Sequence, residues 1–295
     1  MSPKKLPFPF GSAQWPQQVQ PNIKKRHKSS TYDAPWSRKY PARLARAIIL
    51  DGLTRPVIKL LADPKIIGIE NILGLKGPAI FAANHTSHLD TPLLISVLPE
   101  QFRHKTVVAA GADYFFDKRW KAILSSFSIA AVPMERTKVS RRSAQLAAKL
   151  INEGWSLAIF PEGGRTPDGW MKPFRGGAAY LSEQCNVPVV PVYLEATGEI
   201  LPKGSKRIHL ASVTVNFGTI LYPQGDMRAY ASRIETEIAT LADEVASDWW
   251  SAKLRSAKGL TPDPGGPQAA PWRRSWSLGP PRRLWRGRKK HDWQQ

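Results

Sequence analysis

A histidine and an aspartate stand five positions apart in the stretch N-H-T-S-H-L-D, residues 84–90. If a turn brings them together, the carboxylate of Asp90 can accept from one ring nitrogen of His85 and fix its tautomer. The other ring nitrogen can then take a proton from a substrate hydroxyl. The alternative is a hydrogen-bonded structural histidine. The pair alone does not decide between general-base catalysis and a structural role.

A second stretch with candidate functional residues, F-P-E-G-G-R-T at residues 160–166, follows an apolar run. Gly163 and Gly164 let the backbone approach a bulky anion, and Arg165 offers a planar fork of donors suited to phosphate. Glu162 could accept a hydrogen bond from a substrate hydroxyl. A glycine-rich turn carrying a surface ion pair would have the same composition. We therefore take Glu162, Gly163 and Arg165 as candidate substrate-binding residues.

Four short blocks occur in order: residues 84–90, V-P-M-E-R at 132–136, residues 160–166, and V-P-V-V-P-V at 187–192. Together they resemble the glycerolipid acyltransferase family, which includes glycerol-3-phosphate and lysophosphatidate acyltransferases. The first and third blocks match closely through Asn84, His85, Ser87 and Asp90 and through residues 160–163 and Arg165. The other two match more loosely, chiefly at Arg136 and Pro191. The resemblance covers roughly residues 60–220.

The resemblance implies acyl transfer from a thioester, acyl-CoA or acyl-carrier protein, to a glycerol hydroxyl, with His85 as base and Asp90 as its orienter. It implies neither a cofactor nor a metal. Arg136 becomes a second candidate phosphate ligand, although a solvated arginine is an alternative. Lys172 and Arg175 are weaker candidates, and His88 is interpreted as a loop residue.

One departure bears on the acceptor. Many relatives with a phosphate-bearing acceptor carry a lysine between the first and second blocks, whereas residues 107–114 here read V-V-A-A-G-A-D-Y. Lysophosphatidate is the expected acceptor, with glycerol-3-phosphate, another lysolipid or a glycolipid as alternatives. A catalytically inactive lipid-binding adaptor is the alternative from another class, and the intact His85, Asp90 and Glu162 argue against it.

Strand-like and helix-like segments alternate around these blocks, which predicts a single α/β domain with a largely parallel sheet flanked by helices. Such sheets place ligands at the carboxyl ends of their strands, where the first and third blocks stand. The expected strands are residues 66–69, 79–83, 107–110, 156–160, 187–194 and 211–217. The expected helices are residues 91–98, 118–127, 138–153, 177–184 and 226–257.

The net charge of +20 belongs mainly to the ends of the chain. Residues 1–40 are interpreted as a disordered basic arm, and residues 259–295 as a disordered tail rich in arginine, tryptophan and proline. The acyltransferase domain is placed at residues 41–258. Residues 41–62 form an amphipathic helical segment, broken or kinked at Pro56, which either lies in a membrane interface or packs on its own domain.

For an enzyme with lipid substrates, the simplest partner of these basic segments is an anionic membrane surface. The near balance of charge in the centre argues against a nucleic-acid ligand. The lone Cys185 fits a reducing compartment, no apolar run is long enough to span a bilayer, and the start does not have the pattern of a signal peptide. The sequence thus predicts a cytoplasmic, membrane-peripheral protein.

Overall fold

A computed structural model describes residues 32–135, 141–166, 169–202 and 207–266. Seven strands form one sheet in the order β1-β7-β6-β2-β5-β3-β4. All pairs are parallel except β6 with β7. The predicted largely parallel α/β fold is therefore confirmed. The strands are β1 Lys65–Ile67, β2 Ile80–Ala83, β3 Thr106–Gly111, β4 Ala131–Met134, β5 Ser156–Ile159, β6 Val189–Glu195 and β7 Thr214–Phe217.

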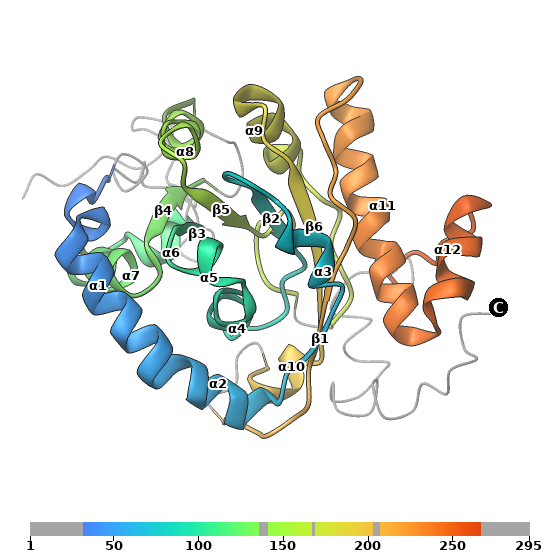
Figure 1. The fold of residues 1–295 in the computed structure, drawn as a ribbon, viewed down its shortest axis with the longest axis horizontal. Coiled ribbons are helices and arrows are strands. Elements are labelled where there is room, and N and C mark those ends of the chain that lie inside the picture. Colours follow the sequence, from blue (N-terminus) through green and yellow to red (C-terminus); the bar gives the residue numbers. More distant parts are fainter. Residues whose placement is uncertain (1–31, 136–140, 167–168, 203–206, 267–295) are drawn as a thin grey trace, which may run out of the picture.

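Helices cover both faces of the sheet (Figure 1), so successive side chains of a central strand enter opposite cores. In β2, Ile80 and Ala82 pack in the cluster formed with α8, α9 and α11, whereas Phe81 and Ala83 pack in the cluster formed with α2, α4 and α5. The helices are α1 Tyr40–Ile49, α2 Arg55–Ala62, α3 Glu70–Leu73, α4 Asp90–Val97, α5 Glu100–Arg103, α6 Ala112–Phe115, α7 Arg119–Ile129, α8 Arg141–Asn152, α9 Gly177–Cys185, α10 Thr197–Ile200, α11 Met227–Ala246 and α12 Trp249–Ala257.

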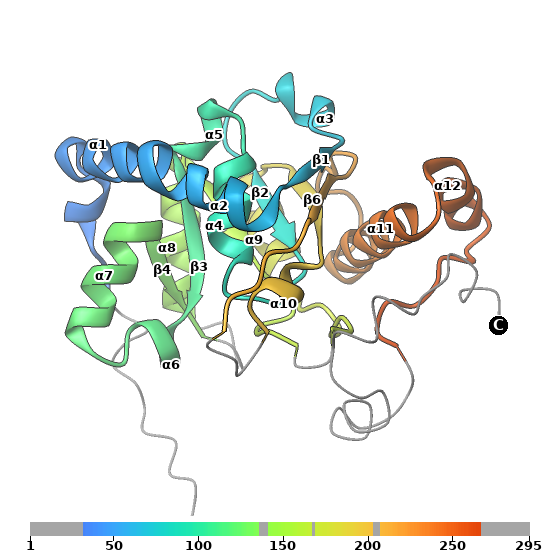
Figure 2. The same cartoon turned by 90° about the horizontal axis from the view of Figure 1, so that it is seen from below.

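The amphipathic segment is continuous rather than broken at Pro56. A π-helical turn, Leu50–Thr54, joins α1 to α2, and Pro56 follows it in the first turn of α2. Because proline has no N–H to donate, its place just after this π-helical turn puts the missing donor where the regular α-helical hydrogen bonding already changes. Figure 2 shows α1 and α2 running on in almost the same direction. Leu50, Ile58 and Ala62 pack into the core, so one face of this segment belongs to the domain.

Three sequence predictions need correction. Residues 35–38 form a 3₁₀ helix and α1 begins at Tyr40, so the disordered arm does not extend to residue 40. Residues 226–257 form two helices instead of one, because Asp248 caps a new helix by accepting from the Ser251 N–H. Residues 259–266 are ordered, and the Met171 N–H donates to the Pro264 carbonyl. Residues 1–31 and 267–295 lie outside the described residues.

The strand β4 is not among the strands expected from the sequence, and Pro133 occupies its third position. It lies at the edge of the sheet and pairs only with β3, where a proline costs the fewest ladder hydrogen bonds. No described helix combines the length and the apolar character needed to cross a membrane.

Candidate active site

The loop between β2 and α4 brings His85 and Asp90 together, as the sequence predicted. The Nδ1 atom of His85 lies 2.8 Å from Asp90 Oδ2, and the same oxygen accepts the N–H groups of Thr86 at 2.7 Å and Ser87 at 2.9 Å. Because backbone N–H groups only donate, this oxygen acts as an acceptor, and His85 must carry its proton on Nδ1. The lone pair of Nε2 is therefore available to a substrate.

The surroundings of this pair hold the imidazole in place. The carboxyl group of Asp90 is fully buried, and the His85 side chain is 17% exposed. The His85 ring stacks on Phe160 with a centroid distance of 4.2 Å. Asn84, at the carboxyl end of β2, exchanges two hydrogen bonds with the backbone of Leu194 in β6. These contacts fix the His85 ring while leaving one of its sides accessible.

Glu162 is buried, and each of its two carboxyl oxygens accepts a backbone N–H group. Glu162 is only 3% exposed. Its Oε1 accepts the backbone N–H of His85 at 2.7 Å, and its Oε2 accepts the backbone N–H of Lys172 at 3.1 Å. Burial raises the pKa of Glu162 to about 8, although the two N–H groups and the charge of Lys172 lower it. Both oxygens of Glu162 thus accept backbone N–H groups, and Glu162 is not among the residues that line the cavity between the two loops. It is a positioning residue that joins the loop at residues 160–172 to the His85 loop.

Gly163 and Gly164 have different roles in the second loop. Gly163 has a φ of +71°, which favours glycine, and its N–H donates to the Phe160 carbonyl. A Cβ at Gly164 would meet nothing within 4 Å, so this position faces open space. The Lys172 ammonium donates to the carbonyls of Gly164 and Arg165 at 3.1 and 2.9 Å. Lys172 therefore braces the loop that presents Arg165.

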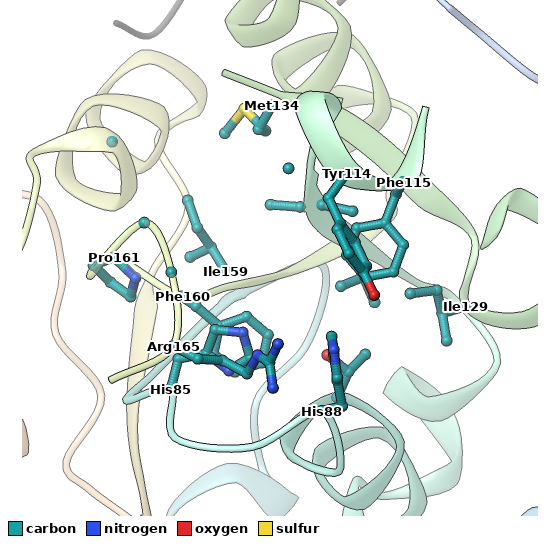
Figure 3. A pocket seen from close by; sticks show the side chains of 18 of the residues that line it. His85, His88, Tyr114, Phe115, Ile129, Met134, Ile159, Phe160, Pro161 and Arg165 are labelled. Atoms are coloured by element: carbon teal, nitrogen blue, oxygen red, sulfur yellow. The ribbon is translucent and has the colours of Figure 1, made fainter. Parts of the chain in front are cut away.

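A cavity of about 520 Å³ connects these groups (Figure 3). His85, Gly163, Gly164 and Arg165 line its polar end together with Arg175. Much of the rest of its lining comes from β3, α6, the end of α7 and β4 with the residue after it. This part is largely apolar, with Val108, Phe115, Ile129 and Met134, and also includes Ser128 and Glu135. A ligand with a charged group and a hydrocarbon chain suits a cavity whose lining is basic in one part and largely apolar in another.

The structure brings together His85, Asp90, Glu162, Gly163 and Arg165, while Arg136 lies outside the described residues. Sequence reasoning missed His88 and Tyr114, which line the same cavity and stack on each other. The signal for His88 was its place within the first block, three residues after His85. Within the described residues, no group of three or more His, Cys, Asp or Glu side chains could hold a metal ion.

Comparisons with known proteins relate this chain to acyltransferases. Residues 63–195 match a family model described as Acyltransferase. A chloroplastic 1-acyl-sn-glycerol-3-phosphate acyltransferase of Brassica napus is 32% identical over 145 residues, which are 48% of this chain and 40% of that protein. The human 1-acyl-sn-glycerol-3-phosphate acyltransferase beta is 30% identical over 139 residues, 47% of this chain and 49% of that one. The chain thus spans less than half the length of these curated relatives.

A solved structure shares the fold. The crystal structure of the 1-acyl-sn-glycerophosphate acyltransferase PlsC from Thermotoga maritima aligns with a TM-score of 0.53 and 22% sequence identity. The alignment covers 70% of this chain and 84% of that one. The likeness therefore extends beyond the segment that the family model matches.

Proposed function

We propose that this protein acylates 1-acylglycerol-3-phosphate to give phosphatidate, a step of phospholipid synthesis, because residues 63–195 match a family model described as Acyltransferase and the similar proteins are named 1-acyl-sn-glycerol-3-phosphate acyltransferases. The observation that carries the proposal is the imidazole of His85, whose Nδ1 meets the carboxyl group of Asp90. His85 lines a cavity together with Arg165 and a group of apolar side chains.

The proposed step needs no covalent enzyme intermediate. The acceptor hydroxyl attacks the carbonyl carbon of the thioester while His85 Nε2 takes its proton. The buried carboxylate of Asp90 stabilises the imidazolium that forms. The carbon–sulfur bond then breaks, and the departing thiolate takes the proton back from Nε2. The products are an ester and a free thiol, and His85 regains its starting state.

The polar and apolar ends of the cavity take different parts of the substrates. The guanidinium of Arg165 is suited to the phosphate of the acceptor, since its fork of N–H groups matches two phosphate oxygens. The apolar wall formed by Val108, Phe115, Ile129 and Met134 suits an acyl chain. The acyl donor in this proposal is acyl-CoA or acyl-carrier protein.

Incubating the purified chain with labelled acyl-CoA and a panel of acceptors tests this function. Lysophosphatidate should be acylated, and glycerol-3-phosphate, lysophosphatidylcholine and monoacylglycerol should react more slowly. The Arg165→Ala variant should raise the KM for lysophosphatidate about 10- to 100-fold, because a charge-assisted hydrogen bond is lost, and leave the KM for acyl-CoA unchanged. A faster reaction with another acceptor would replace lysophosphatidate in the proposal, and acylation of none would refute it.

We also propose that the protein docks on the cytoplasmic face of an anionic membrane through the outer side of α1 and α2. Tyr40, Leu44, Ile48 and Leu60 are all exposed there, and basic residues flank them. The helix α7 adds a further exposed apolar stripe, Trp120, Ile123 and Leu124. Arg46 of α1 donates to the Phe127 carbonyl of α7, so these two helices are held together. The basic ends of the chain would add electrostatic attraction.

Co-sedimentation with anionic vesicles tests the docking. The double variant Leu44→Glu/Ile48→Glu should weaken binding at least about tenfold, because two apolar side chains no longer enter the interface. Leu210→Glu, at an exposed leucine outside these three helices, is the matched control. Equal binding by both variants would exclude the α1 face as the docking site.

A further inference from the structure

His88 stands on the same rigid turn as His85. The Ser87 hydroxyl donates to the Leu201 carbonyl and accepts the Leu89 N–H, while the Ser87 N–H donates to Asp90. The backbone is thereby fixed on both sides of His88, at Ser87 by the carboxyl group that orients His85 and at Leu89 by the Ser87 hydroxyl. A side chain at this position has a fixed relation to the base.

The ring of His88 packs against the ring of Tyr114, which lines the same cavity. Its ring and that of Tyr114 are stacked, with centroids 5.8 Å apart and planes 26° apart. The Lys121 ammonium lies 5.3 Å from the centre of the Tyr114 ring and pairs with Asp117. Stacking occupies a face of the imidazole, so its edge, where the nitrogens lie, is the part suited to a hydrogen bond with a ligand in the cavity.

Arg165 and His88 line the same cavity from different loops. In Figure 3 the guanidinium of Arg165 extends toward the part of the cavity where His88 stands. A phosphate monoester has three terminal oxygens and carries between one and two negative charges near neutral pH. One guanidinium fork meets two of these oxygens, so a third oxygen needs a donor from another direction.

We propose that His88 is a specificity-determining residue that donates a ring N–H to the phosphate of the acceptor, opposite Arg165. The segment at residues 107–114 brings no lysine to this cavity and ends at Tyr114, which supports His88 instead. This inference rests on the proposed function and deepens it. His88 selects a lysolipid with a terminal phosphate over one without.

Kinetics with His88 variants of the full chain test this assignment. His88→Ala should raise the KM for lysophosphatidate about tenfold or more, as expected for a lost charge-assisted hydrogen bond. The kcat should stay within about twofold of wild type, and turnover of monoacylglycerol should not change. His88→Lys should restore the KM, and His88→Gln should lie in between. His209→Ala, at a histidine that does not line the cavity, controls for the loss of an imidazole.

The donor is the other possible source of the phosphate, since coenzyme A also carries phosphate groups. A rise in the KM for acyl-CoA with an unchanged KM for lysophosphatidate would assign His88 to the donor and overturn the proposal. An equal effect on monoacylglycerol, or failure of His88→Lys to restore the KM, would reduce His88 to a packing role and also overturn it.

Calorimetric titration with glycerol-3-phosphate separates this inference from the proposed function, because it needs no acyl transfer. Wild type and His88→Lys should bind it at least about tenfold more tightly than His88→Ala. Equal binding by wild type and His88→Ala, or none by either, refutes the role of His88 even in an active enzyme. If the titration succeeds and no lysolipid is acylated, the phosphate site stands and the proposed function fails.

Discussion

The two loops that build the site, residues 84–90 and residues 160–172, each contain a buried carboxyl group that accepts backbone N–H groups. In the first loop Asp90 receives two local N–H groups and the imidazole of His85 on one oxygen. In the second, Glu162 receives one N–H on each oxygen, one of them from the first loop. The first loop is therefore organised from within, and the second serves to hold the first. The two motifs look alike in sequence, but the carboxyl group of the first orients the base, and that of the second holds the first loop in place.

The largest effect is expected where the first loop loses its base. His85→Ala should lower kcat about 10²- to 10⁴-fold, because no other group replaces the proton acceptor at that position. Acyl-transfer assays beside thermal melting curves check this. The control is His209→Ala, which should keep both activity and melting temperature. A folded His85→Ala enzyme with wild-type turnover would remove His85 from the mechanism.

A smaller loss is expected when Asp90 keeps its shape and loses its charge. In Asp90→Asn the amide oxygen can still accept the three donors at Oδ2, so the tautomer of His85 is retained. The amide nitrogen takes the place of Oδ1, which has no hydrogen-bond partner among the described residues. We expect kcat to fall about 10- to 100-fold through the weaker stabilisation of the imidazolium. A change in KM alone would contradict this reading.

The stability of the protein should depend on pH through Glu162 of the second loop. Because the pKa of Glu162 is raised from 4.5 to about 8, its contribution to stability is fully present below pH 4.5 and is lost as pH rises through 8. Glu162→Gln cannot ionise, so wild type should lose at least about 1 kcal/mol more than this variant between pH 5 and pH 9.

Denaturant unfolding across this pH range measures the difference. Glu183→Gln, at an exposed glutamate of α9, is the matched control and should follow wild type. Glu162→Gln should also be less stable at low pH by about 1–3 kcal/mol, since its amide can accept only one of the two N–H groups. Parallel pH profiles for wild type and Glu162→Gln would disprove the role of burial.

The smallest effects separate the adjacent glycines of the second loop. Gly163→Ala should cost about 1–2 kcal/mol of stability because its φ of +71° is unfavourable for a residue with a Cβ. Gly164→Ala faces open space and should change stability by less than about 0.5 kcal/mol. Equal losses at both positions would mean that backbone conformation does not govern this loop.

The sequence predicted the sheet and the His85–Asp90 pair because both depend on local patterns: buried apolar runs, a short loop and a helix start. It did not predict what Glu162 touches, because its main partner, the N–H of His85, is 77 residues away. The strand β4 was not expected, since Pro133 is typical of a turn. The helices α11 and α12 were expected as one helix, since the cap at Asp248 does not interrupt the spacing of the apolar residues. His88 was overlooked because its neighbour Tyr114 comes from a separate strand–helix connection.

Both backbone groups of His85 are bonded to the second loop: its N–H to Glu162 and its carbonyl to the Thr166 N–H. The two loops follow β2 and β5, which pair although they are far apart in the chain, so we expect these bonds to close late in folding. A partly folded chain would thus hold the sheet without holding the base in place. Activity should return last on refolding, and the amide protons of His85 and Thr166 should exchange with solvent only when the whole sheet opens.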